Sequence, residues 1–229
     1  MIETISSQLT PLTAALFSEK SSDRILASSL VLFNQYSFSR VTSASIANHT
    51  GILEGSLWYH FNTKKDILAE HIRLLRQVFL SKNVDTNSSD PKTIIQGIFR
   101  SYDFIWDFRY ILRDDFQKSL KEDEPVLETV RRVNHSLDQW AVGRIQHSYA
   151  KGVIQINPQN IENLSEITLV IGRYWLDFSS KKNLHASDGS LRKKGLDHIF
   201  TVLMPYLSSK AKLIIRHMMD KRVYWMINI

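Results

Sequence analysis

Residues 45–61 read SIANHTGILEGSLWYHF, and this stretch decides the fold of the N-terminal part of the chain. Ile46 and Ala47 lie on the inner face of a short polar helix. Gly51 permits the left-handed turn that ends this helix, and a second, shorter helix is expected at about 53–59. Two helices joined by a tight turn predict a helix-turn-helix.

Four aromatic or imidazole rings close the stretch, at positions 58–61. Leu57 and Phe61 are four residues apart, so both can face the core. Trp58, Tyr59 and His60 then lie on other faces, where their N–H and O–H groups can donate to phosphate oxygens while the rings pack on sugars. Two small residues, Gly55 and Ser56, precede these rings. The spacing therefore predicts a surface that approaches a DNA groove.

Thr42 and Lys64 stand at the starts of the helices on either side of this stretch. Free backbone N–H groups at a helix N-terminus attract phosphate, so both positions are candidate phosphate contacts. We expect Thr42 to cap its helix and Asn62 or Thr63 to cap the helix that begins at Lys64. Upstream, we expect Ser22 or Asp23 to cap a helix that ends near Tyr36.

The fold class follows from the whole chain of 229 residues. Apolar residues recur at three- and four-residue spacing, only eight glycines and five prolines interrupt them, and sustained alternation is missing. This pattern predicts an all-α fold. The polar stretch NVDTNSSDP at 83–91 is the clearest break, with Asp90 as a helix cap and Pro91 as the first helical residue.

We divide the chain at that break. Residues 1–19 are expected to form an N-terminal arm, residues 20–84 a helix-turn-helix domain with its connecting fourth helix, and residues 85–229 a larger helical domain for regulation and dimerisation. Four long helical patterns follow the break, at about 91–113, 123–150, 158–180 and 189–208.

Composition excludes several classes of protein. Cysteine is absent, which rules out disulfides and thiolate metal sites and fits a reducing cytoplasm. A basic secretory start and an apolar run long enough to span a bilayer are both missing from the sequence, so we expect a cytoplasmic protein. The net charge of +6 favours polyanionic partners. No phosphate-binding glycine loop, His-Glu-x-x-His or Gly-x-Ser-x-Gly motif is present, so we predict no enzyme activity, cofactor or metal site.

Residues 24–70 resemble the N-terminal domain of the TetR family of bacterial transcriptional regulators. The diagnostic core is SIANHTGILEGSLWYHFNTKKDIL, which is similar to the family's pattern without gaps. The resemblance implies a three-helix DNA-binding head, a larger helical ligand-binding domain, and a homodimer that binds a palindromic operator in double-stranded DNA.

Carried over position by position, the resemblance implies a set of DNA-contacting residues. They are Thr42, Glu54, Gly55, Ser56, Trp58, Tyr59, His60 and Lys64. Three positions depart from the family pattern: Ser37 replaces a turn glycine, Ser43 an apolar residue, and Glu54 a Lys or another polar residue. An acid repels phosphate but can accept a hydrogen bond from a cytosine amino group, so the role of Glu54 and the operator sequence stay open.

The stretch YDFIWDFRYILRDDF at 102–116 is rich in aromatic rings. Ordinary packing between long helices is one explanation, and a pocket for an apolar or aromatic small molecule is the other. The candidate pocket residues on one expected helix face are Tyr102, Trp106, Arg109 and Tyr110, with His135 and Trp140 on the next helix. Arg109 could pair with a ligand carboxylate, or equally with Asp103, Asp107 or Asp114.

The two helical patterns at 158–180 and 189–208 are the candidate dimer interface implied by the resemblance. The residues expected there are Ile167, Ile171, Gly172, Trp175, Phe178, Leu196, Ile199, Phe200 and Leu203. Completion of the monomer's own core is the alternative for the same residues. The basic and apolar tail at 210–229 could lie on a membrane, but we expect it to cap the domain or a partner subunit.

These observations predict a homodimeric transcriptional repressor that a small apolar or aromatic ligand releases from its operator. The alternative is a DNA-binding regulator without a small effector, acting as an activator or under the control of a protein partner. A buried pocket with convergent polar groups favours the first, and a solid core favours the second.

Overall fold

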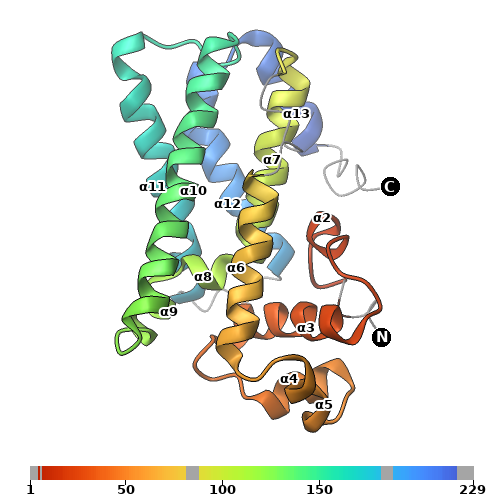
Figure 1. Ribbon diagram of the computed structural model, residues 1–229. Helices are drawn as coiled ribbons and strands as arrows, with labels where there is room; N and C mark the ends of the chain where they lie inside the picture. The colour runs from red at the N-terminus through yellow and green to blue at the C-terminus, as the bar shows by residue number, and fades with distance from the viewer. Residues whose placement is uncertain (1–4, 6, 81–87, 182–187, 221–229) are drawn as a thin grey trace. The chain divides into compact units, whose positions relative to one another are not determined.

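The computed structural model describes residues 5, 7–80, 88–181 and 188–220 (Figure 1). The regular structure of these residues is helical, apart from one isolated bridge between Ile154 and Leu207, which confirms the predicted all-α class. None of the described helices is long and apolar enough to cross a membrane.

The chain forms two compact units. Unit 1 comprises Met1–Leu80 and Asp103–Val133, and unit 2 comprises Ser81–Tyr102 and Asn134–Ile229. Packing therefore groups residues 103–133 with the helix-turn-helix. The sequence-based boundary near residue 84 lies outside the described residues and stays a prediction.

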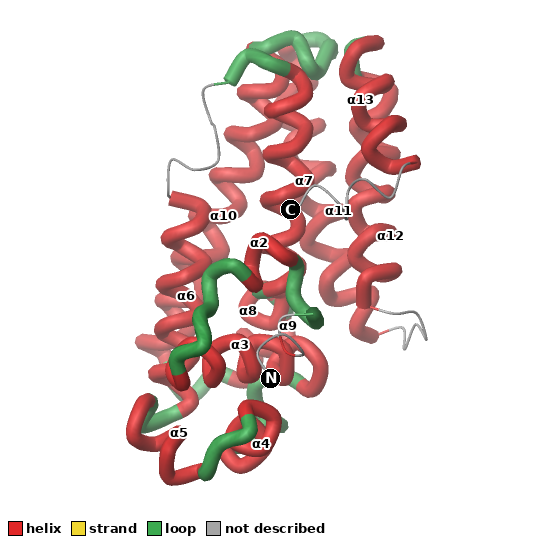
Figure 2. The backbone as a smooth tube through the Cα atoms, turned by 90° about the vertical axis from the view of Figure 1, so that its right-hand side faces the viewer, coloured by secondary structure: helices red, strands yellow, loops and turns green. Residues whose placement is uncertain are grey.

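The helices of unit 1 differ widely in length, from four residues in α2 and α8 to seventeen in α6. They are α2 (Pro11–Ala14), α3 (Ser21–Tyr36), α4 (Ser43–Thr50), α5 (Glu54–His60), α6 (Lys64–Leu80), α8 (Arg109–Leu112), α9 (Asp114–Ser119) and the start of α10 (Glu124–Ala150). In Figures 1 and 2, α4 and α5 lie together next to α3. The core of unit 1 forms where α3 buries one side against these neighbours, with Ile25, Leu30 and Phe33 fully enclosed.

Unit 2 holds the remaining helices. They are α7 (Pro91–Asp107, up to Tyr102), the rest of α10, the short helix η1 (Pro158–Asn160), α11 (Ile161–Lys181), α12 (Asp188–Leu203), η2 (Met204–Tyr206) and α13 (Ser209–Asp220). α11 and α12 pack along each other, and the rings of Phe99 and Phe200 approach to 4.8 Å between centroids. Arg173 joins α11 to α10 through bonds of 2.8 and 2.6 Å to the carboxylate of Asp138.

Two predicted helix caps beyond α4 are confirmed, and one is wrong. Thr63 and Asp66 cap α6 reciprocally, since each backbone N–H donates to the other's side chain. Asp90 accepts from the N–H of Thr93 and caps α7. The cap of α3 is Lys20 rather than Ser22 or Asp23. The carboxylate of Asp23 instead accepts from the N–H and hydroxyl of Ser18.

The predicted helix at 91–113 is also wrong, because α7 ends at Asp107. The side chain of Asn34, on α3, occupies the break. Its amide nitrogen donates to the carbonyl of Asp107 at 2.6 Å, and its oxygen accepts from the N–H of Tyr110 at 3.1 Å. These two bonds satisfy backbone groups near the break. The break after Asp107 is therefore stabilised by Asn34, a residue more than seventy positions away along the chain.

Part of the predicted N-terminal arm packs into unit 1. Ile5, Leu9 and Thr13 are buried. Thr10 donates both its N–H and its hydroxyl to the carboxylate of Asp107. The backbone carbonyl of Asp107 also accepts from Asn34, so the N-terminal arm and α3 both bind Asp107.

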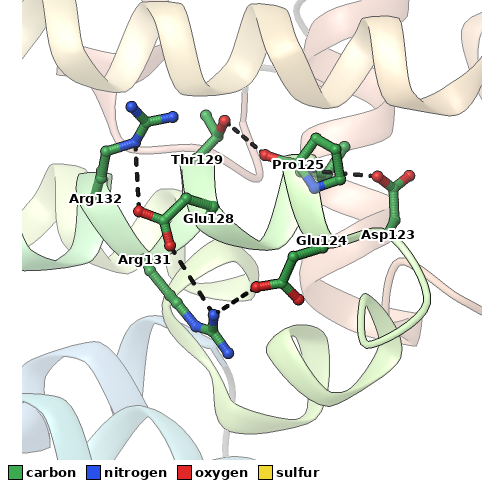
Figure 3. Close-up of polar contacts among 8 residues, drawn as sticks. Asp123, Glu124, Pro125, Glu128, Thr129, Arg131 and Arg132 are labelled. Carbon is green, nitrogen blue, oxygen red and sulfur yellow. Dashed lines mark hydrogen bonds and ion pairs between the residues drawn. The ribbon is translucent and has the colours of Figure 1, made fainter.

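The start of α10 carries a group of charged side chains (Figure 3). Arg131 lies between two carboxylates, 3.0 Å from Glu124 and 4.0 Å from Glu128. Arg132 also approaches Glu128. All of these side chains are more than half exposed. Exposed ion pairs of this kind contribute about 0–1 kcal/mol each, so they add little to the stability of the folded protein.

Candidate nucleic-acid interface

The turn between α4 and α5 has the geometry that the sequence predicts. The Thr42 hydroxyl accepts from the N–H of Ser45 at 3.1 Å, and the Ser45 hydroxyl lies 3.0 Å from the N–H of Thr42, which completes a capping box. Gly51 ends α4 at φ 71° and ψ 40°, in the left-handed region. Ile46 and Ala47 are buried, so α4 is held against α3.

α5 buries one edge and exposes the rest. Leu57 and Phe61 are buried, as predicted. Tyr59 is 86% exposed and Trp58 39% exposed. Glu54, Gly55, Ser56 and His60 are also exposed. The structure thus brings six of the eight sequence-predicted DNA contacts together on one short helix.

Gly55 has a distinctive place on this helix. A Cβ atom added there would meet no other atom within 4 Å. The packing of unit 1 therefore does not require glycine at this position. Its small size leaves the outer face of α5 slim, which is what a close approach to DNA needs.

Thr42 and Lys64 flank α5, and their side chains differ in availability. Thr42 is exposed, although its hydroxyl serves the capping box. Lys64 is half-buried, and its Nζ donates to the carbonyls of Phe38 and Val41 at 2.9 and 2.8 Å. Partial burial lowers the pKa of Lys64. The ammonium has three donors, and Lys64 uses two of them to fix the loop before α4.

One further contact and one backbone conformation shape the helix-turn-helix, and sequence reasoning identified neither. Arg24 on α3 donates to the carbonyl of Thr50 at 2.6 Å, close to the end of α4. Ser37, at the end of α3, adopts φ 72° and ψ 152°. Ser37 is the position where the sequence departs from a family glycine, and this backbone conformation favours glycine strongly.

The candidate ligand residues do not form one helix face. Trp106, Arg109 and Tyr110 belong to unit 1, and Tyr102 belongs to unit 2. The break after Asp107 separates Arg109 and Tyr110 from α7. All four side chains are buried. Arg109 donates to the carbonyl of Trp106 at 2.7 Å and stacks over the Trp106 ring at 4.5 Å.

The other two candidates lie on the part of α10 that belongs to unit 2. His135 is exposed and Trp140 is half-buried. The guanidinium of Arg144 lies 5.9 Å from the Trp140 ring centroid. The ligand site stays a prediction.

The candidate dimer residues separate into two groups. Trp175, Leu196, Ile199, Phe200 and Leu203 are buried within unit 2 itself. Ile167 is half exposed, and Ile171, Gly172 and Phe178 are partly exposed. Two exposed apolar residues that sequence reasoning missed, Val170 and Tyr174, lie on the same side of α11 as Ile167. Extending the three- and four-residue spacing from Ile167 would have found both.

Comparisons with known proteins agree with this geometry. A family model described as bacterial regulatory proteins, tetR family, matches residues 25–71. A second model, described as a bacterial transcriptional repressor, matches residues 65–213. The biofilm operon icaADBC HTH-type negative transcriptional regulator IcaR of Staphylococcus aureus is 24% identical over 191 residues, which are 81% of this chain and 98% of IcaR.

Solved structures share the fold. A TetR-family transcriptional regulator from Marinobacter aquaeolei superposes with a TM-score of 0.64 at 24% identity, over 88% of this chain and 98% of that one. The ketosteroid transcriptional regulator KstR2 of Mycobacterium tuberculosis gives a TM-score of 0.56 at 17% identity, over 84% and 97%. With two family models that together span the helix-turn-helix and most of the helices after it, the chain belongs to the TetR family of bacterial transcriptional regulators, which bind DNA and are not enzymes.

Proposed function

We propose that the chain is a homodimeric repressor that binds a palindromic operator through α5 and leaves it when a small apolar or aromatic ligand binds. One observation carries the DNA-binding part. α5 exposes Tyr59, Trp58 and His60 around the slim residues Gly55 and Ser56, while Leu57 and Phe61 hold the helix in the core. Donors and flat rings on a thin helix suit phosphate, sugar and base edges.

The proposed dimer rests on the outer side of α11. Val170 and Tyr174 are 62% and 63% exposed, and Ile167 lies one turn before Val170 and two turns before Tyr174. An apolar stripe on a helix can pair with the same stripe of a second copy about a two-fold axis. Trp175 and Leu196 are buried in the core of unit 2. The proposed dimer surface therefore comprises only the exposed side of α11.

The proposed ligand response rests on the family membership and on the aromatic content of the chain, not on an identified pocket. The competing function is a regulator without a small effector. Native mass spectrometry of the purified protein separates the two. A copurified small molecule that is lost when operator DNA is added supports ligand-controlled release. A ligand-free protein whose operator affinity resists a panel of aromatic acids and phenols supports the competing function.

Selection of duplexes from a random DNA pool tests the proposed DNA binding. We expect a palindromic consensus whose affinity falls steeply with salt, because protein cations displace counterions from phosphates. Tyr59→Ala is expected to weaken operator binding without unfolding the protein, since the side chain is 86% exposed. A selection that enriches no sequence would contradict the proposed function.

Sedimentation tests the dimer. Tyr174→Arg places a charge in the exposed stripe and is expected to shift the protein to monomers. Leu213→Arg is the matched control, because Leu213 is similarly exposed, at 66%, but lies on α13. Equal behaviour of the two variants would remove α11 from the interface.

A further inference from the structure

The two most exposed large hydrophobic side chains among the described residues lie on α5 and at its N-cap. They are Tyr59 on α5, at 86%, and Leu53, at 81%, which is the N-cap of that helix. Leu53 contributes its carbonyl to α5, accepting from Ser56 at 3.0 Å. Its side chain is left in solvent, where a leucine contributes nothing to folding.

Leu53 is also an unfavourable cap. The helices on either side begin with side-chain caps, from Thr42 for α4 and Thr63 for α6, whereas Leu53 offers α5 no side-chain hydrogen bond. A Ser or Thr at this position would accept from a free N–H of the first turn and stabilise the helix. The packing and capping of unit 1 therefore give no reason for a leucine at position 53.

The surface around Leu53 indicates a use for it. Leu53 directly precedes Glu54 and Gly55, and Tyr59 lies one turn beyond Gly55 on the exposed side. An apolar side chain next to polar readers of a major groove has one natural target on a base pair, which is the C5-methyl group of thymine.

Resting on the proposed function, we infer that Leu53 is a specificity-determining residue that packs on a thymine methyl in each half-site of the operator. Leu53 belongs to the same surface as the proposed contacts on α5, and it adds an apolar reader to polar ones. The contact favours thymine over cytosine at one position of each half-site, because cytosine lacks the methyl group.

Replacement of single thymines by deoxyuridine tests this contact, because the change removes only the methyl group and keeps base pairing. The probe is the duplex that the unmodified protein selects. At one symmetric pair of thymines we expect deoxyuridine to weaken binding about threefold to fivefold per half-site, the effect of one methyl group returned to water. Leu53→Ser is expected to bind the thymine and deoxyuridine duplexes equally.

The variants keep the test interpretable. Leu53→Ser adds a favourable N-cap, so it is expected to fold at least as stably as the original chain. Leu213→Ser also removes an exposed leucine, and it must keep the original preference for thymine. If no thymine methyl depends on Leu53 while Tyr59→Ala still loses operator binding, the inference is wrong and the proposed function stands. If no operator is selected at all, both fail.

Discussion

His71 and Tyr110 are joined by a hydrogen bond of 2.8 Å inside unit 1, between Nδ1 of the imidazole and the phenol oxygen. The other ring nitrogen, Nε2, lies 3.0 Å from the carbonyl oxygen of Leu26. A carbonyl can only accept, so Nε2 carries the proton and Nδ1 accepts from the Tyr110 hydroxyl. This histidine therefore links α6 to α3 and α8.

The first prediction concerns acid stability. Burial lowers the pKa of His71 to about 4 in the folded protein, against about 6.5 in an unfolded chain. Between these values the unfolded chain binds the extra proton, so stability is lost as the pH falls from 6.5 towards 4. The loss from this residue is about 3 kcal/mol in total.

Urea unfolding at several pH values measures this loss. His71→Gln is the comparison variant, because it keeps polar atoms at the site but does not titrate. We expect a shallower pH dependence between 4 and 6.5 in that variant, whatever its absolute stability. Identical slopes in the two proteins would show that His71 does not titrate as the structure implies.

The second prediction concerns the strained turn after α3. Ser37 has φ 72°, and it is the one non-glycine with positive φ among the described residues. Such a conformation costs about 1–3 kcal/mol for a residue with a side chain. Glycine removes this cost but adds about 0.5–1 kcal/mol of chain entropy. Ser37→Gly should therefore stabilise the protein by about 1 kcal/mol in thermal or urea unfolding.

Ser39→Gly provides the control, because either substitution removes the contact of 3.3 Å between the two serine hydroxyls. Ser39 has no positive φ to relieve. It should lose stability on substitution. A gain of the same size in both variants would assign the effect to the hydroxyl contact.

The third prediction concerns the packing of α12. A Cβ at Gly195 would lie closer than 3.0 Å to the Tyr102 hydroxyl and to the Trp175 indole, a separation that real Cβ atoms essentially never show. The indole is also anchored, since its N–H donates to the carbonyl of Leu191 at 3.0 Å. Gly195→Ala should destabilise the protein by about 1–3 kcal/mol.

Gly143 is the matched glycine for this test. It lies within α10, and an added Cβ there meets nothing within 4 Å. Gly143→Ala should raise stability by up to about 1 kcal/mol through helix propensity. The prediction depends on the opposite signs of the two changes, and two losses of equal size would refute it.

The fourth prediction separates folding from DNA binding at Gly55. Gly55→Ala has room for its methyl group, so the folded protein should be as stable or slightly more stable. The same methyl lies on the exposed face of α5 and should weaken operator binding about tenfold or more, as overpacking of a close interface does. Binding titrations with the selected duplex measure the effect, and full affinity would place Gly55 outside the interface.

The sequence by itself determined the features that depend on neighbours a few residues away. The cap at Thr42, the left-handed turn at Gly51 and the burial of Leu57 and Phe61 all follow from local chemistry and helical spacing, and the structure confirms them. These features define α4 and α5. Local rules failed at α3, where Lys20 precedes the helix without a side-chain hydrogen bond.

Tertiary structure alone decided what depends on distant partners. Asn34 binds backbone groups on both sides of the break after Asp107, and no periodicity within 91–113 could reveal it. The sequence predicts Lys64 as a phosphate contact, but in the structure its ammonium donates to the carbonyls of Phe38 and Val41. A backbone group or an ammonium takes whichever partner the fold brings within reach, and that choice is not encoded in the residues beside it.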